Sequence, residues 1–143
     1  MNEINILNAL KESFDLQKME SEFLKTETGM KSKMEIMNQG YSTYEVPIKE
    51  IKYGTFATTV TYKNGLFVSL NMTLMEKENQ EYNDDMFTEK SLLMEKKKQD
   101  EWLEATIGFL SENYKFQWGT IESVIDWKSW GAYIVIKIHR DYL

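Results

Sequence analysis

The stretch GTFATTVTYKNGLFVSLNMTLM, residues 54–75, determines the fold class that we expect for this chain. It contains two runs rich in β-branched and aromatic residues, joined by Asn64-Gly65. That dipeptide suits the two positive-φ positions of a type I′ turn, so the stretch predicts a β-hairpin. Side chains alternate across a strand. We therefore expect Phe56, Thr58, Val60 and Tyr62 to share one face of the first strand, and Val68, Leu70, Met72 and Leu74 to share one face of the return strand.

Helical and then strand-like patterns precede this hairpin. Apolar residues recur at helical spacing through residues 4–14 and, in a shifted phase, through residues 16–23. This spacing predicts one kinked helix or two, closed by Gly29. The apolar spacing then shortens to about two, which predicts two short strands with a turn at residues 38–40. Pro47 predicts an edge strand or a strand end, because proline cannot donate a ladder hydrogen bond.

A second helix is predicted for residues 91–114, with Thr88 or Asp85 as its cap. Its apolar stripe would consist of Leu103, Ile107, Leu110 and Tyr114. Strand-like alternation returns after it and ends in residues 133–139, where Ile134, Ile136 and Ile138 share a face. Residues 126–131 are expected to form a hairpin turn.

This order of elements predicts an α+β fold for residues 1–143 as a single domain. We expect an antiparallel sheet of about five or six strands in hairpins. The N-terminal helical segment and the central long helix would pack on one face of the sheet. The other face would be left for solvent or for a docking partner.

The composition narrows the functional classes. The 143 residues carry a net charge of −6, and Arg140 is the one arginine among 17 basic residues. Phosphate-backbone binding needs clustered cations, so nucleic acid is not an expected partner. No cysteine is present, which excludes a disulfide scaffold and a thiolate nucleophile. The acidic N-terminus does not resemble a signal peptide, and no run approaches the length of a membrane span. We therefore expect a cytoplasmic protein that does not bind membranes.

The sequence contains few candidate residues for catalysis or metal binding. His139 is the single histidine, and Asp141 and Ser129 are its nearest acid and hydroxyl in the sequence. A dyad of His139 and Asp141 is geometrically conceivable, but no nucleophile elbow accompanies it, and a lone histidine near a chain end is usually structural. Asp84-Asp85 is the densest acidic pair, which is more typical of a solvated connection than of a metal site. We expect no enzymatic activity, no metal and no cofactor.

Two groups of residues are candidates for partner binding. Residues 76–90 hold six acids with little periodicity, and Trp127 and Trp130 flank a predicted turn, where partly exposed indoles would be typical of interaction hot spots. Core packing is the alternative interpretation of the tryptophans, Trp102 and Trp118 included. The candidate partner-binding residues are Glu76, Glu78, Glu81, Asp84, Asp85, Trp127 and Trp130.

Acidity, small size and sparse chemistry favour a small protein-binding inhibitor. Bacterial immunity proteins and antitoxins are the commonest proteins of this type, and a basic toxin or nuclease domain is the partner that such a surface would steer. The chain would act as a monomer or a homodimer. The order of elements is also similar to that of the small acidic chaperones that escort secreted effectors. A small hydrolase or ligand-binding domain is the alternative from another class.

Overall fold

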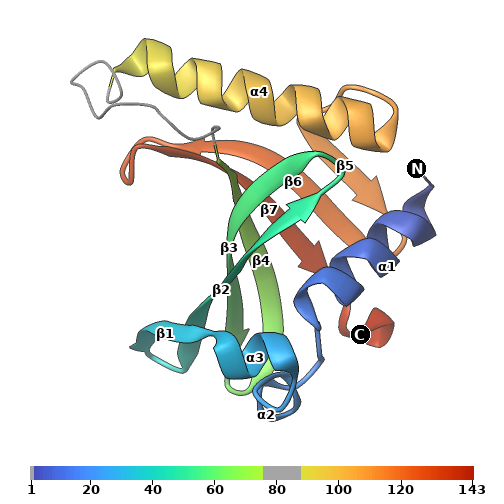
Figure 1. The fold of residues 1–143 in the computed structure, drawn as a ribbon, viewed down its shortest axis with the longest axis vertical. Coiled ribbons are helices and arrows are strands. Elements are labelled where there is room, and N and C mark those ends of the chain that lie inside the picture. Colours follow the sequence, from blue (N-terminus) through green and yellow to red (C-terminus); the bar gives the residue numbers. More distant parts are fainter. Residues whose placement is uncertain (1, 76–87) are drawn as a thin grey trace.

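The computed structural model describes residues 2–75 and 88–143, and it contains an antiparallel sheet with helices packed against it (Figure 1). The helices are α1 (Glu3–Phe14), α2 (Glu20–Phe23), α3 (Glu27–Lys31) and α4 (Glu89–Ile107), with a 3-10 turn at Arg140–Tyr142. The strands are β1 (Lys33–Asn38), β2 (Tyr41–Ile51), β3 (Gly54–Lys63), β4 (Leu66–Leu74), β5 (Asn113–Phe116), β6 (Gly119–Asp126) and β7 (Gly131–Ile138).

The sheet joins two meanders. Its strand order is β1-β2-β3-β4-β7-β6-β5, so β1 to β4 form one meander, β5 to β7 form the other, and β4 pairs with β7 between them. The α+β class, the antiparallel sheet and the long helix are confirmed. The described residues contain seven strands, more than the predicted five or six.

The hairpin of residues 54–75 forms as predicted. Asn64 and Gly65 have φ values of 49° and 81°, as a type I′ turn requires. One detail of the return strand differs, because Tyr62 pairs with Phe67 while Thr61 pairs with Ser69. This bulge places Phe67 on the buried face in the position predicted for Val68.

The N-terminal segment forms three short helices. α1 ends at Asp15, which adopts the left-handed conformation (φ 51°). The Asp15 carboxylate accepts hydrogen bonds from the backbone N–H (3.0 Å) and the hydroxyl (2.7 Å) of Thr28. Gly29 lies inside α3, so the prediction that it closes a helix is wrong. The side chain of Asp15 therefore ties the end of α1 to the start of α3.

The long helix begins as predicted and ends early. Thr88 and Ser91 form a reciprocal capping box at its start. Gly108 ends it in the left-handed conformation (φ 108°), which stops the helical hydrogen bonding although the apolar spacing continues. The predicted stripe therefore overran the helix: Leu110 lies beyond it and is exposed, and Tyr114 lies in β5.

Pro47 lies inside β2, which as a whole stands between β1 and β3, but at Pro47 β2 has a neighbour only on the β3 side, so the predicted edge position holds locally and the predicted strand end does not. Two local features accommodate its missing N–H. β1 pairs only with residues 41–45 of β2, and the register with β3 shifts between Val46 and Lys49. Pro47 therefore occupies a bulge that has no strand partner on its other side.

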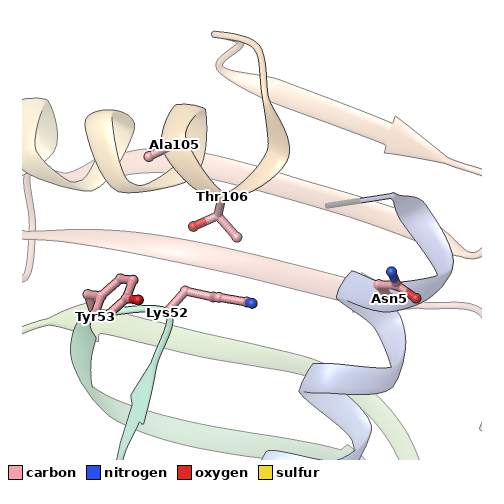
Figure 2. A pocket seen from close by; sticks show the side chains of 5 residues that line it. All are labelled: Asn5, Lys52, Tyr53, Ala105 and Thr106. Atoms are coloured by element: carbon pink, nitrogen blue, oxygen red, sulfur yellow. The ribbon is translucent and has the colours of Figure 1, made fainter.

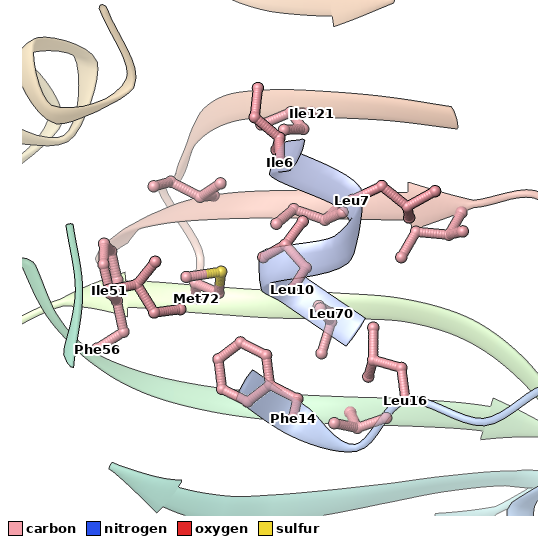
Figure 3. Close-up of a cluster of buried hydrophobic side chains, with 14 of the residues drawn as sticks. Ile6, Leu7, Leu10, Phe14, Leu16, Ile51, Phe56, Leu70, Met72 and Ile121 are labelled. Carbon is pink, nitrogen blue, oxygen red and sulfur yellow. The ribbon is translucent and has the colours of Figure 1, made fainter. Parts of the chain in front are cut away.

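Both major helices cover the same face of the sheet. The apolar side of α1 packs on the sheet, and Figure 3 shows Leu10 and Phe14 in one cluster with Leu70 and Met72 of β4, the central strand. The α1 residues in this core are Ile6, Leu7, Leu10 and Phe14. On α4, buried Gln99 donates its side-chain amide to the Ser123 hydroxyl (2.9 Å) and the Tyr133 carbonyl (2.8 Å). No helix of the described residues covers the opposite face. Within the same residues, no helix combines the length and apolar character that a membrane crossing requires.

Candidate functional site

The helix-free face of the sheet forms an open trough of about 640 Å³. Outward-facing residues of β2, β3, β4 and β7 make its floor, because their neighbours in sequence point into the core. The polar and small floor residues are Thr43, Ala57, Thr59, Thr61, Asn71, Thr73 and Val135. One rim carries Glu35, Ile36 and Glu45, and the other carries Val124, Asp126, Ser129 and Tyr133.

The two rims come from strands that are far apart in the sheet. Four strands separate β1 from β6, which in a flat sheet corresponds to about 24 Å. Residues of both strands nevertheless line the same hollow, so the sheet curves around it. In Figure 1, β1 and the β6–β7 hairpin extend to the left, and α1 lies on the right. The trough is therefore a concave surface directed away from α1.

The floor of the trough is neutral and rich in hydrogen-bonding groups. The hydroxyls of Thr43 and Thr61 contact each other across β2 and β3 at 3.1 Å. In the strand register, Thr59 stands between Glu45 on one side and Asn71 on the other. Hydroxyl and amide groups can both donate and accept, so this floor can pair with the backbone or the side chains of a bound chain.

The β6–β7 hairpin presents two indoles to solvent. Residues 126–131 form the predicted turn, and Trp127 and Trp130 are 51% and 37% exposed. Their rings pack edge to face with centroids 5.7 Å apart. The backbone N–H of Lys128 donates to the Asp126 carboxylate at 2.9 Å, and this bond lowers the pKa of Asp126. The turn thus carries an aromatic pair beside a carboxylate that stays ionised at neutral pH.

The other rim carries a pair of carboxyl groups that sequence reasoning missed. Glu35 sits where the register between β1 and β2 shifts, and Glu45 lies on the trough side of β2. Partial burial, followed by the hydrogen bond and the charge of Glu45, raises the pKa of Glu35. The two side chains are brought to the same rim by a bulge between β1 and β2, and no sequence motif predicts that bulge.

Replacing Glu35 with glutamine is expected to stabilise the protein at neutral pH. A folded-state pKa above the unfolded value means that the stability contributed by Glu35 is fully present below its ordinary pKa of 4.5 and is lost as pH rises through the raised pKa. Above that range the two carboxylates repel each other, by at most about 0.5 kcal/mol because both are exposed and solvent screens their charges. Urea unfolding of wild type and Glu35→Gln should differ by this amount at pH 7 and converge near pH 4. A difference that is constant with pH would contradict the prediction.

The acidic candidates Glu76, Glu78, Glu81, Asp84 and Asp85 lie outside the described residues, so their role in binding stays a prediction. The same holds for the suggestion that Asp84-Asp85 is merely solvated. Within residues 2–75 and 88–143, no group of three or more acidic or histidine side chains is arranged to hold a metal ion.

The structure separates His139 from Ser129. Ser129 precedes β7 and His139 follows it, so they lie at opposite ends of an eight-residue strand. An extended strand of that length spans about 26 Å, which is far beyond the reach of proton transfer. The Ser129 hydroxyl instead contacts the Tyr133 hydroxyl at 3.0 Å. Activation of Ser129 by His139 is therefore excluded.

A second hollow, of about 480 Å³, lies between the β2–β3 turn, α1 and α4 (Figure 2). The indole N–H of Trp102 donates to the carbonyls of Ile51 (3.2 Å) and Lys52 (3.1 Å) and so fixes this turn. Lys52 extends toward Asn5 across the hollow in Figure 2. The other lining residues are Tyr53, Ala105 and Thr106. Among the described residues that line it, no carboxylate or histidine faces the lysine, so no acid–base pair is assembled here.

No protein-family model and no curated protein matches the sequence. Among solved structures, a chain of the complex described as "Rhs1-CT in complex with cognate immunity protein RhsI1" is similar to this chain, with 13% sequence identity and a TM-score of 0.48. The match covers 85% of this chain and 74% of that chain. At this level the two chains share part of their backbone arrangement, and nothing about function carries over.

Proposed function

We propose that this chain is a protein-binding inhibitor of the immunity-protein type, which neutralises a partner protein by surface complementarity and has no catalytic role of its own. The observation that carries the proposal is the concave, helix-free sheet face beside the exposed Trp127–Trp130 pair. We further propose that the protein acts in the cytoplasm.

The chemistry of this face favours a protein partner. Interfaces are typically built from aromatic anchors surrounded by polar groups that exclude water. Trp127 and Trp130 supply such anchors at one rim, and exposed Ile36 supplies an apolar contact at the other. Between them, the threonine-rich floor offers hydrogen bonds over several strands. A macromolecule can engage both rims at once, as a small solute cannot.

The test is a pull-down from native lysate with three baits: wild type, Trp127→Ala/Trp130→Ala, and the control Phe109→Ala/Leu110→Ala. The control removes two apolar side chains that are 55% and 64% exposed, near the C-terminal end of α4. We expect one stoichiometric partner with wild type and the control. The tryptophan variant should lose at least about 30-fold in affinity, the effect of removing an interface hot spot. Equal capture by all three baits would contradict the proposed surface.

Inhibition needs a separate readout. The captured partner is expressed in a bacterial host alone, with wild-type chain, or with the Trp127→Ala/Trp130→Ala variant. We expect the partner alone to arrest growth, wild type to restore it, and the tryptophan variant to fail. A partner whose effect on growth is the same with and without the wild-type chain would refute the inhibitor role.

A further inference from the structure

The trough is lined by one sign of charge. Glu35, Glu45 and Asp126 contribute carboxylates, and no lysine, arginine or histidine is among the described residues that line it. A concave surface with charges of one sign focuses their field and attracts the opposite charge. The occupant that complements this surface is therefore cationic.

The Glu35–Glu45 pair is the strongest feature of this surface. The bulge in β1 lets two successive residues, Glu35 and Ile36, both line the trough, where strict alternation would direct one of them away. Lys33 stands opposite Glu45 in the register, yet neither glutamate has a cation within 4 Å in the described part of the chain. The fold thus places two carboxyl groups on the trough side, and neither forms a salt bridge among the described residues.

A cation on the pair would remove this repulsion. The ammonium of lysine or the guanidinium of arginine can donate to both carboxylates. Beyond the pair, Thr59 and Asn71 continue the row of Lys33 and Glu45 across the sheet. Their polar groups can pair with the backbone of an extended chain that crosses the trough toward Asp126.

We propose that the trough receives an extended segment of the partner protein, with a lysine or arginine side chain seated on the Glu35–Glu45 pair. This inference rests on the proposed function and specifies the chemistry of its partner. The segment runs across the floor of Thr59 and Asn71, and a second basic residue approaches Asp126 on the opposite rim.

The probe is the peptide acetyl-Arg-Thr-Arg-Thr-Arg-Thr-amide, titrated at low salt into isotopically labelled protein and followed by amide chemical shifts. An extended chain of this sequence presents all three arginines on one face. We expect the shifts to concentrate at Thr43, Thr59, Thr61 and Asn71. Glu35→Gln/Glu45→Gln should weaken the apparent affinity at least fivefold. These substitutions relieve a repulsion, so they preserve the fold.

A matched variant measures nonspecific attraction by the acidic protein. Glu101→Gln/Glu104→Gln removes the same charge from exposed positions of α4 and should change the affinity less than twofold. Equal weakening by both double variants, shifts outside the trough, or equal binding of a peptide with glutamine in place of arginine would each overturn the inference. The titration does not involve the native partner. If the peptide causes no shifts in the trough while the tryptophan-dependent partner is still captured, this inference is refuted and the proposed function is not.

Discussion

Replacing Trp118 with alanine is expected to lower the free energy of unfolding by about 3–5 kcal/mol, the usual cost of truncating a buried tryptophan. Trp118 is 1% exposed and stacks on Phe116 with ring centroids 5.0 Å apart. Its indole N–H donates to the Glu3 carbonyl at 3.1 Å, and so the side chain also joins the turn before β6 to the start of α1. The substitution removes a large core volume and a contact between distant parts of the chain.

Urea unfolding followed by circular dichroism would measure this effect, and the melting temperature should fall by about 10–15 °C. Trp118→Phe keeps an aromatic ring and loses the hydrogen bond, so it should be less destabilising than alanine. Trp127→Ala is the surface control, and its effect should stay below about 1 kcal/mol. If Trp118→Ala and Trp127→Ala had equal effects, the assignment of Trp118 to the core would be wrong.

Gly119→Ala is expected to be nearly as disruptive, by about 2–5 kcal/mol, although it adds only one methyl group. Gly119 adopts a φ of 156°, and a Cβ atom placed there would lie 1.9 Å from the carbonyl oxygen of Lys137 on β7. That atom belongs to the backbone of the neighbouring strand, so β6 and β7 would have to move apart. The change would weaken the strand pair that carries the Trp127–Trp130 hairpin.

Comparing Gly65→Ala with Gly119→Ala separates the cost of a left-handed backbone conformation from the cost of steric overlap. Gly65 has a φ of 81°, and no atom lies within 4 Å of the position that an alanine methyl group would take, so only the left-handed conformation opposes alanine there. Its expected cost is about 1–2 kcal/mol. In thermal unfolding, the melting temperature of Gly119→Ala should be lower than that of Gly65→Ala. The reverse order would contradict the close approach of β6 and β7.

The sequence was most informative where a local pattern has one physical solution. Asn64-Gly65 fits a type I′ turn, Thr88 fits a helix cap, and residues 126–131 fit a hairpin turn, and all three form. The helix-period pattern that ran to Tyr114 failed, because Gly108 ends α4 whatever apolar spacing follows it. The strand that begins at Asn113 was therefore merged with the helix.

The candidate surface was less predictable, since it depends on pairings between distant segments. Trp127 and Trp130 could be proposed from their place in a turn, although their role in binding stays a prediction. The carboxyl pair of Glu35 and Glu45 depends on a bulge between two strands, and no spacing in the sequence marks it. The trough itself requires that β4 pair with β7, which brings together the two halves of the chain.

The alternation of side chains in the central strands has an evolutionary consequence. On β3, Phe56 and Val60 belong to the core, whereas Thr59 and Thr61 belong to the trough. Substitutions on the two faces share few contacts, so their effects on stability should be nearly additive. The trough residues can therefore change in sequence while the same scaffold is kept. A library randomised only at trough positions would sample new binding specificities while the residues that form the core stay unchanged.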